Sequence, residues 1–410
     1  MLSTFEKDRQ YVKFCLYGFL KNLRLYDAFL LLYFLDNGLS FSQIGILYAV
    51  REITTNLVEI PSGILADSYG RKRSLLGAFL IYILAFLSFY FSVSFLLLLT
   101  AMVLVGVGDA FRSGTHKGMI MDYLRMKQWE AHKVRYYGQT RSWSQLGSAI
   151  SALIAGVTVF YSGNYRIIYL ISITPYLLNF INIYTYPSEL DHSRKAKNKP
   201  RKKLRAVISD LLMVLQRRKV LRIVNSAALH SAYLKSVKDY VQPLIVNLAL
   251  IIPVLSSLDT ENRNGLAVGI TYFFIFLLTS FASRNAGNLY ARHLPNIQTK
   301  TLLFGFFGGI ISGCLFYYEL WLLSLLAFIL IYIVENLRKP ILTGFLADRV
   351  PNEILTSVIS AQSSYQTLTT AILSIAIGLL ADGFGVGVAL GLVSGILLIF
   401  TLLLGNRSAD

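Results

Sequence analysis

Apolar stretches long enough to cross a lipid bilayer recur along the whole chain and alternate with short polar segments. Clear examples are residues 75–91, 95–107, 301–317, 320–334 and 386–404. A membrane-spanning helix needs about 20 predominantly apolar residues. The pattern predicts twelve spans, over residues 12–36, 41–66, 74–92, 95–122, 138–161, 165–186, 219–250, 264–290, 299–317, 320–347, 354–381 and 384–404. The predicted fold class is therefore an all-α integral membrane protein.

One long polar connection, residues 187–218, divides these spans into two sets of six. We expect a six-helix bundle over residues 1–186, a basic linker over 187–218 and a second six-helix bundle over 219–410. An even number of spans puts both termini on the same side of the membrane.

The two halves resemble each other in sequence. KNLRLYDAFL at 21–30 aligns with KSVKDYVQPL at 235–244, GILY at 45–48 with GITY at 269–272, and DAFR at 109–112 with ENLR at 335–338. Each match is short, but the three occur in the same order and in corresponding spans. They indicate an internal duplication with a pseudo-symmetric pair of bundles.

Composition and charge placement agree with a membrane protein. Hydrophobic residues make up 55% of the 410 residues and charged residues only 15%, against about 25% in soluble domains. The net charge of +17 comes largely from clusters at 71–73, 125–135 and 194–205, which all fall on one side of the predicted membrane. The positive-inside rule makes that side cytoplasmic. We therefore expect a multi-pass protein of the plasma (inner) membrane with cytoplasmic termini.

Other classes are disfavoured. The basic clusters lie between apolar spans on one side of the predicted membrane, whereas nucleic-acid binding would need a basic groove with aromatic platforms beside it. Cys15 and Cys314 both lie in apolar runs, so a disulfide framework is not expected. No cleavable leader precedes the first span, which we expect to be retained. His116, Lys117 and His230 show no metal-ligand spacing, and neither a phosphate-binding Gly-Lys-Ser/Thr loop nor a Gly-x-Ser-x-Gly elbow occurs. No cofactor or metal is predicted, and no enzyme.

A short motif joins the second and third spans. Gly63-x-x-x-Asp67-x-x-Gly70-Arg71-Lys72 resembles the signature loop of the major facilitator superfamily, G-x-x-x-D-x-x-G-R-R/K. The six-plus-six plan extends the resemblance over the whole chain. It implies a cytoplasmic latch, in which an acid such as Asp122, at the end of the fourth span, pairs with the basic residues of the loop.

Two qualifications apply to this latch. Arg71, Lys72 and Arg73 would also serve as a topology anchor without any latch. The corresponding stretch of the second half, 287–294, has Ala291 where the acid should be. The latch is therefore expected to be held mainly by the first half.

Thirteen ionisable residues lie near the middle of the predicted spans: Lys21, Arg24, Asp27, Arg51, Glu52, Asp109, Arg112, Lys235, Lys238, Asp239, Glu335, Arg338 and Lys339. At a lipid-facing helix centre each would cost about 2.5–3.5 kcal/mol. They must therefore be paired or face water inside the protein. Helical spacing supports a shared face in three sets: Lys235, Lys238, Asp239 and Gln242; Asp109, Arg112, Ser113 and His116; and Glu335, Arg338 and Lys339. The family resemblance implies that such helices line a central substrate cavity.

Two interpretations of these charges stay open. In the first they are ion pairs that fasten helices: Asp109 with Arg112, Glu335 with Arg338, and Asp27 with Arg24. In the second some cations bind substrate, because eight basic residues face five acidic ones and pairing alone leaves a positive excess. The candidate substrate-binding residues are Lys21, Arg24, Arg51, Lys235, Lys238, Gln242, Arg338 and Lys339. Candidates for proton coupling or intramembrane ion pairs are Asp27, Glu52, Asp109, Arg112, Asp239 and Glu335.

The predicted function is secondary active transport of a small polar, anionic organic solute by alternating access, as symporter or antiporter. The expected partners are that solute, the lipid bilayer and protons or another ion, and the expected state is a monomer. One alternative is proton-coupled efflux of drugs or amphiphiles, although Met102 stands where such exporters carry an arginine and residues 147–156 lack their proline. A further alternative is a membrane sensor with the same fold that transports nothing.

Overall fold

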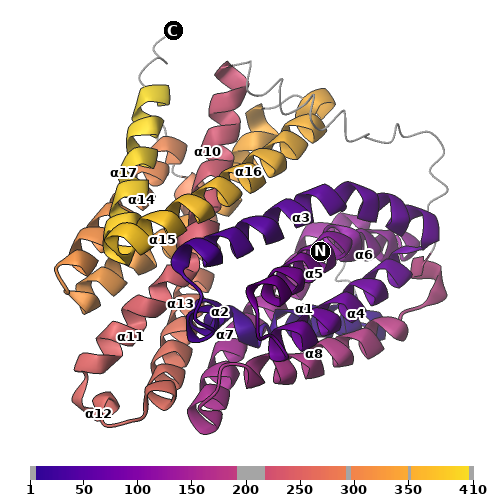
Figure 1. Ribbon diagram of the computed structural model, residues 1–410. Coiled ribbons are helices and arrows are strands. Elements are labelled where there is room, and N and C mark those ends of the chain that lie inside the picture. Colours follow the sequence, from indigo (N-terminus) through magenta and orange to yellow (C-terminus); the bar gives the residue numbers. More distant parts are fainter. Residues whose placement is uncertain (1–5, 192–217, 292–296, 350–351, 406–410) are drawn as a thin grey trace.

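The computed structural model describes residues 6–191, 218–291, 297–349 and 352–405, and within these ranges the chain is helical without strands (Figure 1). The first half, residues 6–191, contains α1 (Arg9–Asn22), η1 (Leu25–Ala28), α2 (Leu30–Asp36), α3 (Phe41–Tyr69), α4 (Arg71–Tyr90), α5 (Phe95–Arg112), α6 (Thr115–Met126), η2 (Glu130–His132), α7 (Lys133–Ser162), α8 (Ile167–Tyr184) and η3 (Ser188–Asp191). In the second half, residues 218–405, lie α10 (Arg218–Val237), η4 (Lys238–Tyr240), α11 (Val241–Ile251), α12 (Pro253–Ser256), α13 (Thr260–Ala291), α14 (Ile297–Tyr317), α15 (Trp321–Arg349), α16 (Asn352–Phe384) and α17 (Val386–Gly405).

A helix or a broken helix occupies each of the twelve predicted spans. Nine stretches of the described helices are long and apolar enough to cross a membrane by length and composition alone. The three predicted spans outside that set, 12–36, 41–66 and 219–250, are charged, and two of them are also broken. The predicted all-α membrane fold is confirmed.

The breaks fall at matching places in the two halves. The first span is interrupted by η1 between α1 and α2, and the seventh by η4 between α10 and α11. Arg24, which precedes η1, aligns with Lys238 of η4 in the repeat seen in the sequence. Because η4 interrupts the helix, the stripe predicted over Lys235–Gln242 is not one continuous helix face.

The fourth span is also broken, between α5 and α6. Gly114 there has φ +70°, in the left-handed region that glycine occupies without steric cost. The corresponding helix of the second half, α15, has no such interruption in its described residues. The stripe predicted from Asp109 to His116 is therefore split between two helices.

Two helix pairs join the halves, α7 with α13 and α3 with α16 (Figure 1). A Cβ added at Gly156 of α7 would lie 2.7 Å from the carbonyl oxygen of Gly265 in α13, so the two backbones touch there. Gly45 of α3 is packed in the same way against the backbone of Ser374 in α16. Small residues allow this close approach where lipid provides no hydrophobic driving force.

Some of the polar contacts between the halves lie at one face of the molecule. The carboxylate of Asp382, near the end of α16, accepts the backbone N–H groups of Phe41 and Ser42 at the start of α3, both at 2.8 Å. Asn264 of α13 donates its Nδ2–H to the hydroxyl of Tyr165, which precedes α8, at 2.9 Å. We call this the turn face, and the opposite face, which carries Gly70 and Asp122, the basic face. The halves are in contact at the turn face.

The motif over residues 63–72 lies mostly in helices rather than in the predicted loop. α3 continues through Gly63 to Tyr69, α4 begins at Arg71, and only Gly70, with φ +106°, separates them. A Cβ added at Gly63 would meet nothing within 4 Å, so no close helix approach requires this glycine here. The side chain of Asp67 and those of residues 287–294 lie outside the described part of the structure.

Acids of the first half hold the start of α4 in place. Arg71 Nη1 lies 2.6 Å from Asp122 Oδ2. Asp191 Oδ1 accepts the backbone N–H groups of Lys72 at 3.0 Å and Arg73 at 3.3 Å, and so caps the helix. Asp191 belongs to η3, at the beginning of the stretch that the sequence marks as a linker.

Candidate functional site

A cavity of about 420 Å³ lies between the two halves. We call it the central cavity. Its walls come from α1, α3, α5 and α6 of the first half and from α10 of the second half. Seven of the thirteen intramembrane charged residues line it: Lys21, Arg24, Arg51, Glu52, Asp109, Arg112 and Lys235.

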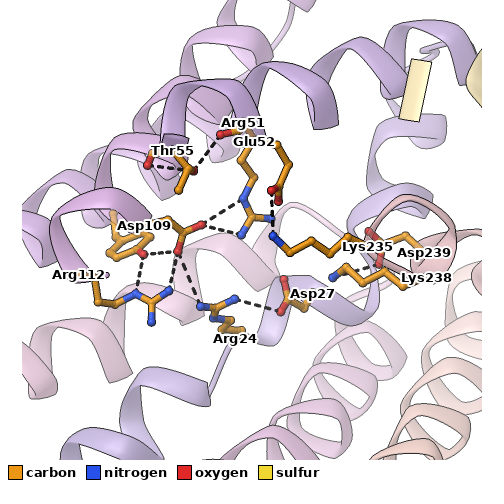
Figure 2. Close-up of polar contacts among 12 residues, drawn as sticks. Arg24, Asp27, Arg51, Glu52, Thr55, Asp109, Arg112, Lys235, Lys238 and Asp239 are labelled. Atoms are coloured by element: carbon orange, nitrogen blue, oxygen red, sulfur yellow. Dashed lines mark hydrogen bonds and ion pairs between the residues drawn. The ribbon is translucent and has the colours of Figure 1, made fainter. Parts of the chain in front are cut away.

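Asp109 is the hub of this cavity (Figure 2). Its Oδ2 lies 2.8 Å from Arg51 Nη2, and its Oδ1 lies 2.8 Å from Arg112 Nη2 and 3.8 Å from Arg24 Nη2. The hydroxyl of Tyr82 donates to Asp109 Oδ1 at 2.6 Å and accepts from Arg112 Nε at 2.9 Å. One carboxylate thus organises three guanidinium groups.

A second group of charges crosses between the halves (Figure 2). Lys235 Nζ of α10 lies 2.9 Å from Glu52 Oε2 of α3. Beside them Arg24 pairs with Asp27 at 3.7 Å, and Lys238 Nζ lies 3.5 Å from Asp239 Oδ1. The predicted pairs of Asp109 with Arg112 and of Asp27 with Arg24 therefore form, together with pairs that the sequence did not indicate.

The lining carries an excess of positive charge. Six cationic side chains face the central cavity, namely Lys21, Arg24, Arg51, Arg112, Lys117 and Lys235, against two carboxylates, Glu52 and Asp109. Asp109 is already paired with three guanidinium groups. Ion pairs among the lining residues therefore do not neutralise the excess of positive charge in the lining. Guanidinium groups present several donors in a fixed plane and suit carboxylate or phosphate oxygens. The arrangement is suited to an anion.

The structure places Gln242 away from the central cavity. Its Oε1 accepts the backbone N–H groups of Leu31 and Leu32, both at 3.1 Å, and its side chain is fully buried. Its Nε2 donates to the hydroxyl of Tyr272 at 3.3 Å and to the carbonyl of Asp27 at 3.4 Å. Gln242 therefore satisfies the exposed backbone at the break in the first span, and Lys238 of η4 is likewise not among the lining residues.

Glu335 and Arg338 are buried inside the second half and do not reach the central cavity. His230 Nδ1 lies 2.8 Å from Glu335 Oε2, and the hydroxyl of Ser231 donates to Glu335 Oε1. Arg338 donates to Thr301 Oγ1 and to backbone carbonyls of α10 and α14. The predicted Glu335–Arg338 pair does not form, because their neighbours on α10 and α14 provide closer partners. Lys339 pairs with Glu335 at 3.6 Å and is more than half exposed.

Several lining residues were not assigned to the site by sequence reasoning. Tyr17, Thr55, His116 and Lys117 all line the central cavity. His116 shares helical spacing with Asp109 and Arg112, which was the available signal. Tyr82 lies in an ordinary apolar run, and nothing in the sequence marks its hydroxyl as a partner of Asp109.

The central cavity is reached from the basic face. Ser113, Gly114 and Lys117 line it where α5 gives way to α6, and all three are exposed to solvent. At the turn face α3 and α16 are in contact, where Asp382 accepts the backbone N–H groups of Phe41 and Ser42. Among the described residues no group of three histidine, cysteine or acidic side chains is arranged to hold a metal ion.

Comparison with known proteins gives consistent matches. The sequence model described as "Major Facilitator Superfamily" matches residues 22–334. An uncharacterized MFS-type transporter of Bacillus subtilis (strain 168), YxaM, is 21% identical over 377 residues, which cover 92% of this chain and 90% of that protein.

Solved transporter structures show a similar fold. A structure of the nucleoside transporter NupG matches with a TM-score of 0.78 and 13% identity over 98% of this chain and 100% of that one. A D-xylose-proton symporter matches with a TM-score of 0.71 and 13% identity over 96% and 95% of the two chains. A bacterial homologue of the human lysosomal transporter Spinster, solved in an inward-facing and occupied conformation, matches with a TM-score of 0.72 and 13% identity over 98% of each chain.

Proposed function

Because the chain belongs to the major facilitator superfamily, a family of secondary transporters, we propose that it moves a small anionic organic solute through the central cavity by alternating access. The observation that carries this proposal is the lining of that cavity, where six cations face two carboxylates. A bound anion would offset the excess of positive charge in this lining, in a region where net charge is costly.

The moving parts are taken to be the two bundles over 1–186 and 219–410, joined by the basic linker 187–218. We place the basic face in the cytoplasm by the positive-inside rule, which puts both termini there in a plasma (inner) membrane. The cavity, closed at the turn face and exposed at Ser113 and Lys117, then corresponds to an inward-open state. Arg71 and Asp122 would act as the latch of that face. Rocking of the bundles would close the basic face and open the turn face.

We propose which carboxylates carry a coupled proton from how closely hydrogen-bond donors and cations surround each of them. Asp109 and Glu335 each have several close partners, which leave their carboxylates little freedom to exchange a proton. Asp239 is buried and lies no closer than 3.5 Å to Lys238 Nζ, and Asp27 lies 3.7 Å from Arg24. Asp27 and Asp239 are therefore the better candidates for carrying a proton.

The test is transport by the purified protein in liposomes. Labelled organic anions are offered with and without an imposed pH gradient, beside a lipophilic cation. We expect uptake of at least one anion, and Lys21→Gln and Lys235→Gln should each raise its KM about tenfold, the value of one lost charged hydrogen bond. Lys300→Gln is the matched control, since Lys300 is exposed on α14 outside the cavity.

Two outcomes would overturn the proposal. Transport of the lipophilic cation with no anion accepted would favour the efflux alternative. Unchanged KM values in both cavity variants would show that the cations do not bind the solute.

A further inference from the structure

A second cavity adjoins the central one. It measures about 380 Å³ and lies between α1, α6 and α7, entirely within the first half. Its polar lining includes Asn22, Thr140, Ser144 and Gln145, and its apolar lining includes Phe14 and Ile120. We call it the neutral cavity, because the described residues that line it without also lining the central cavity are all uncharged.

The two cavities share a boundary. Tyr17, Lys21 and His116 line both of them. The rings of Tyr17 and His116 are stacked, with centroids 3.5 Å apart and planes inclined by 8°. His116 Nε2 lies 3.2 Å from the hydroxyl of Tyr186, which fixes the imidazole from the other side. A stacked aromatic pair therefore lies at the boundary of the two cavities.

The chemistry of the two compartments differs. The central cavity presents guanidinium and ammonium groups, which recognise an acid. Apart from Lys21 and His116 at the shared boundary, the neutral cavity presents amide and hydroxyl groups, which both donate and accept hydrogen bonds. Asn22 donates its Nδ2–H to the carbonyl of Gly18 at 2.7 Å, which leaves its Oδ1 as an acceptor. Such a lining pairs with hydroxyl groups and discriminates against a hydrocarbon, which would leave these groups unsatisfied.

The volumes of the two cavities also favour a solute that is larger than a simple anion. Each cavity falls in the range of about 300–1,000 Å³ that is usual for small-molecule sites. A carboxylate or phosphate alone would be held by the central cavity and would leave the neutral cavity to water. A solute with an acidic group and a body of several carbons would extend from the central cavity into the neutral cavity.

We propose that the solute is an organic acid whose neutral part carries hydroxyl groups, as in a sugar acid. The acid binds the cations of the central cavity, and the hydroxyl groups occupy the neutral cavity beside Gln145 and Ser144. This inference rests on the proposed transport of an anion and specifies its chemical class.

Three probe ligands separate the contribution of the hydroxyl groups to binding from that of the acidic groups. D-Glucarate and adipate are six-carbon dicarboxylates that differ in four hydroxyl groups, and sorbitol has the hydroxyl groups without charge. Binding of each to the purified full-length protein is measured by titration calorimetry. We expect glucarate to bind at least tenfold more tightly than adipate, with sorbitol weakest.

Single-residue variants show which side chains distinguish glucarate from adipate. Gln145→Leu should weaken glucarate binding about tenfold and bring its affinity close to that of adipate, and Ser144→Ala, which only removes a hydroxyl, should act in the same direction. Lys235→Gln should weaken both dicarboxylates together. Lys300→Gln again serves as the control in all titrations.

The outcomes distinguish the two proposals. Equal affinities for glucarate and adipate, with Lys235→Gln weakening both, would overturn the assignment of the neutral cavity and leave anion transport standing. Tight binding of sorbitol with neither dicarboxylate bound would overturn the anionic class itself.

Discussion

At the scale of single residues, Asp109 shows how one acid determines the character of the site. It is partly buried, accepts a hydrogen bond from Tyr82, and lies within 2.8 Å of guanidinium groups from two different helices. Without it, Arg24, Arg51 and Arg112 would face one another in a region of low dielectric. The carboxylate thus sets the spacing of cations that we propose to bind the solute.

Asp109→Asn tests this role. The loss of one partner from a buried ion-pair network costs about 3–5 kcal/mol, because the remaining charges are left uncompensated. We expect the free energy of unfolding in detergent to fall by at least about 3 kcal/mol. Glu52→Gln breaks a pair with the half-exposed Lys235 and should cost about 1 kcal/mol or less. Similar losses in the two variants would show that Asp109 is not the hub.

Basic residues in similar sequence surroundings lie in different places in the structure, and the local sequence does not show which of them line the cavity. Lys235 and Arg338 both lie near the middle of predicted spans, yet Lys235 lines the cavity and Arg338 is 1% exposed inside the second half. The difference depends on how each helix is rotated against its neighbours. The sequence predicted that these charges need partners, but not which partners they have.

At the scale of helices, the breaks in the first and seventh spans are the main departure from the hydrophobic pattern. A broken helix leaves backbone N–H groups that must find partners in the absence of water. Gln242, at the start of α11, provides one for Leu31 and Leu32 of α2. The break in one half is therefore completed by a side chain of the other.

Gln242→Leu removes that partner. Two buried N–H groups would remain without an acceptor, at about 1–3 kcal/mol each. We expect a decrease of at least about 2 kcal/mol in the free energy of unfolding, measured by thermal and denaturant melts. Asn247→Leu on the same helix is the control, since no hydrogen bond of its side chain occurs within the described structure. A melt of Gln242→Leu that matches the control would contradict the bridging role.

At the scale of the whole molecule, the contacts between the halves are unevenly distributed. Asp382, the glycines of α7 and α13, and Tyr165 with Asn264 all hold the turn face closed. A carboxylate at a helix N-terminus is favourable both as a cap and through the helix dipole. Asp382 provides this stabilisation across the interface, so the outward-open state would have to give it up.

Asp382→Asn should therefore shift the population toward a state open at the turn face. Val93 and Val254 are exposed near that face, one in each half. Spin labels at these two positions report the distance between the halves, in a variant in which the native Cys15 and Cys314 are replaced. We expect a longer-distance population to grow several-fold, as a loss of about 1 kcal/mol in capping implies. Asp259→Asn, near the same face but within the second half, should leave the distribution unchanged. An unchanged distribution in Asp382→Asn would show that this cap does not control closure.

The sequence by itself determined the membrane class, the number of spans, the family resemblance and the presence of a charged interior. These follow from hydropathy, from the motif over residues 63–72 and from the cost of charge in lipid, all of which depend on local composition. Only the tertiary structure decided which charges share a cavity, that Gln242 and Arg338 are engaged elsewhere, and that a neutral compartment adjoins the cationic one. Lys235 and Glu52 meet across 183 positions of sequence, and such a contact depends on helix rotation, helix breaks and packing between bundles, which no local pattern encodes.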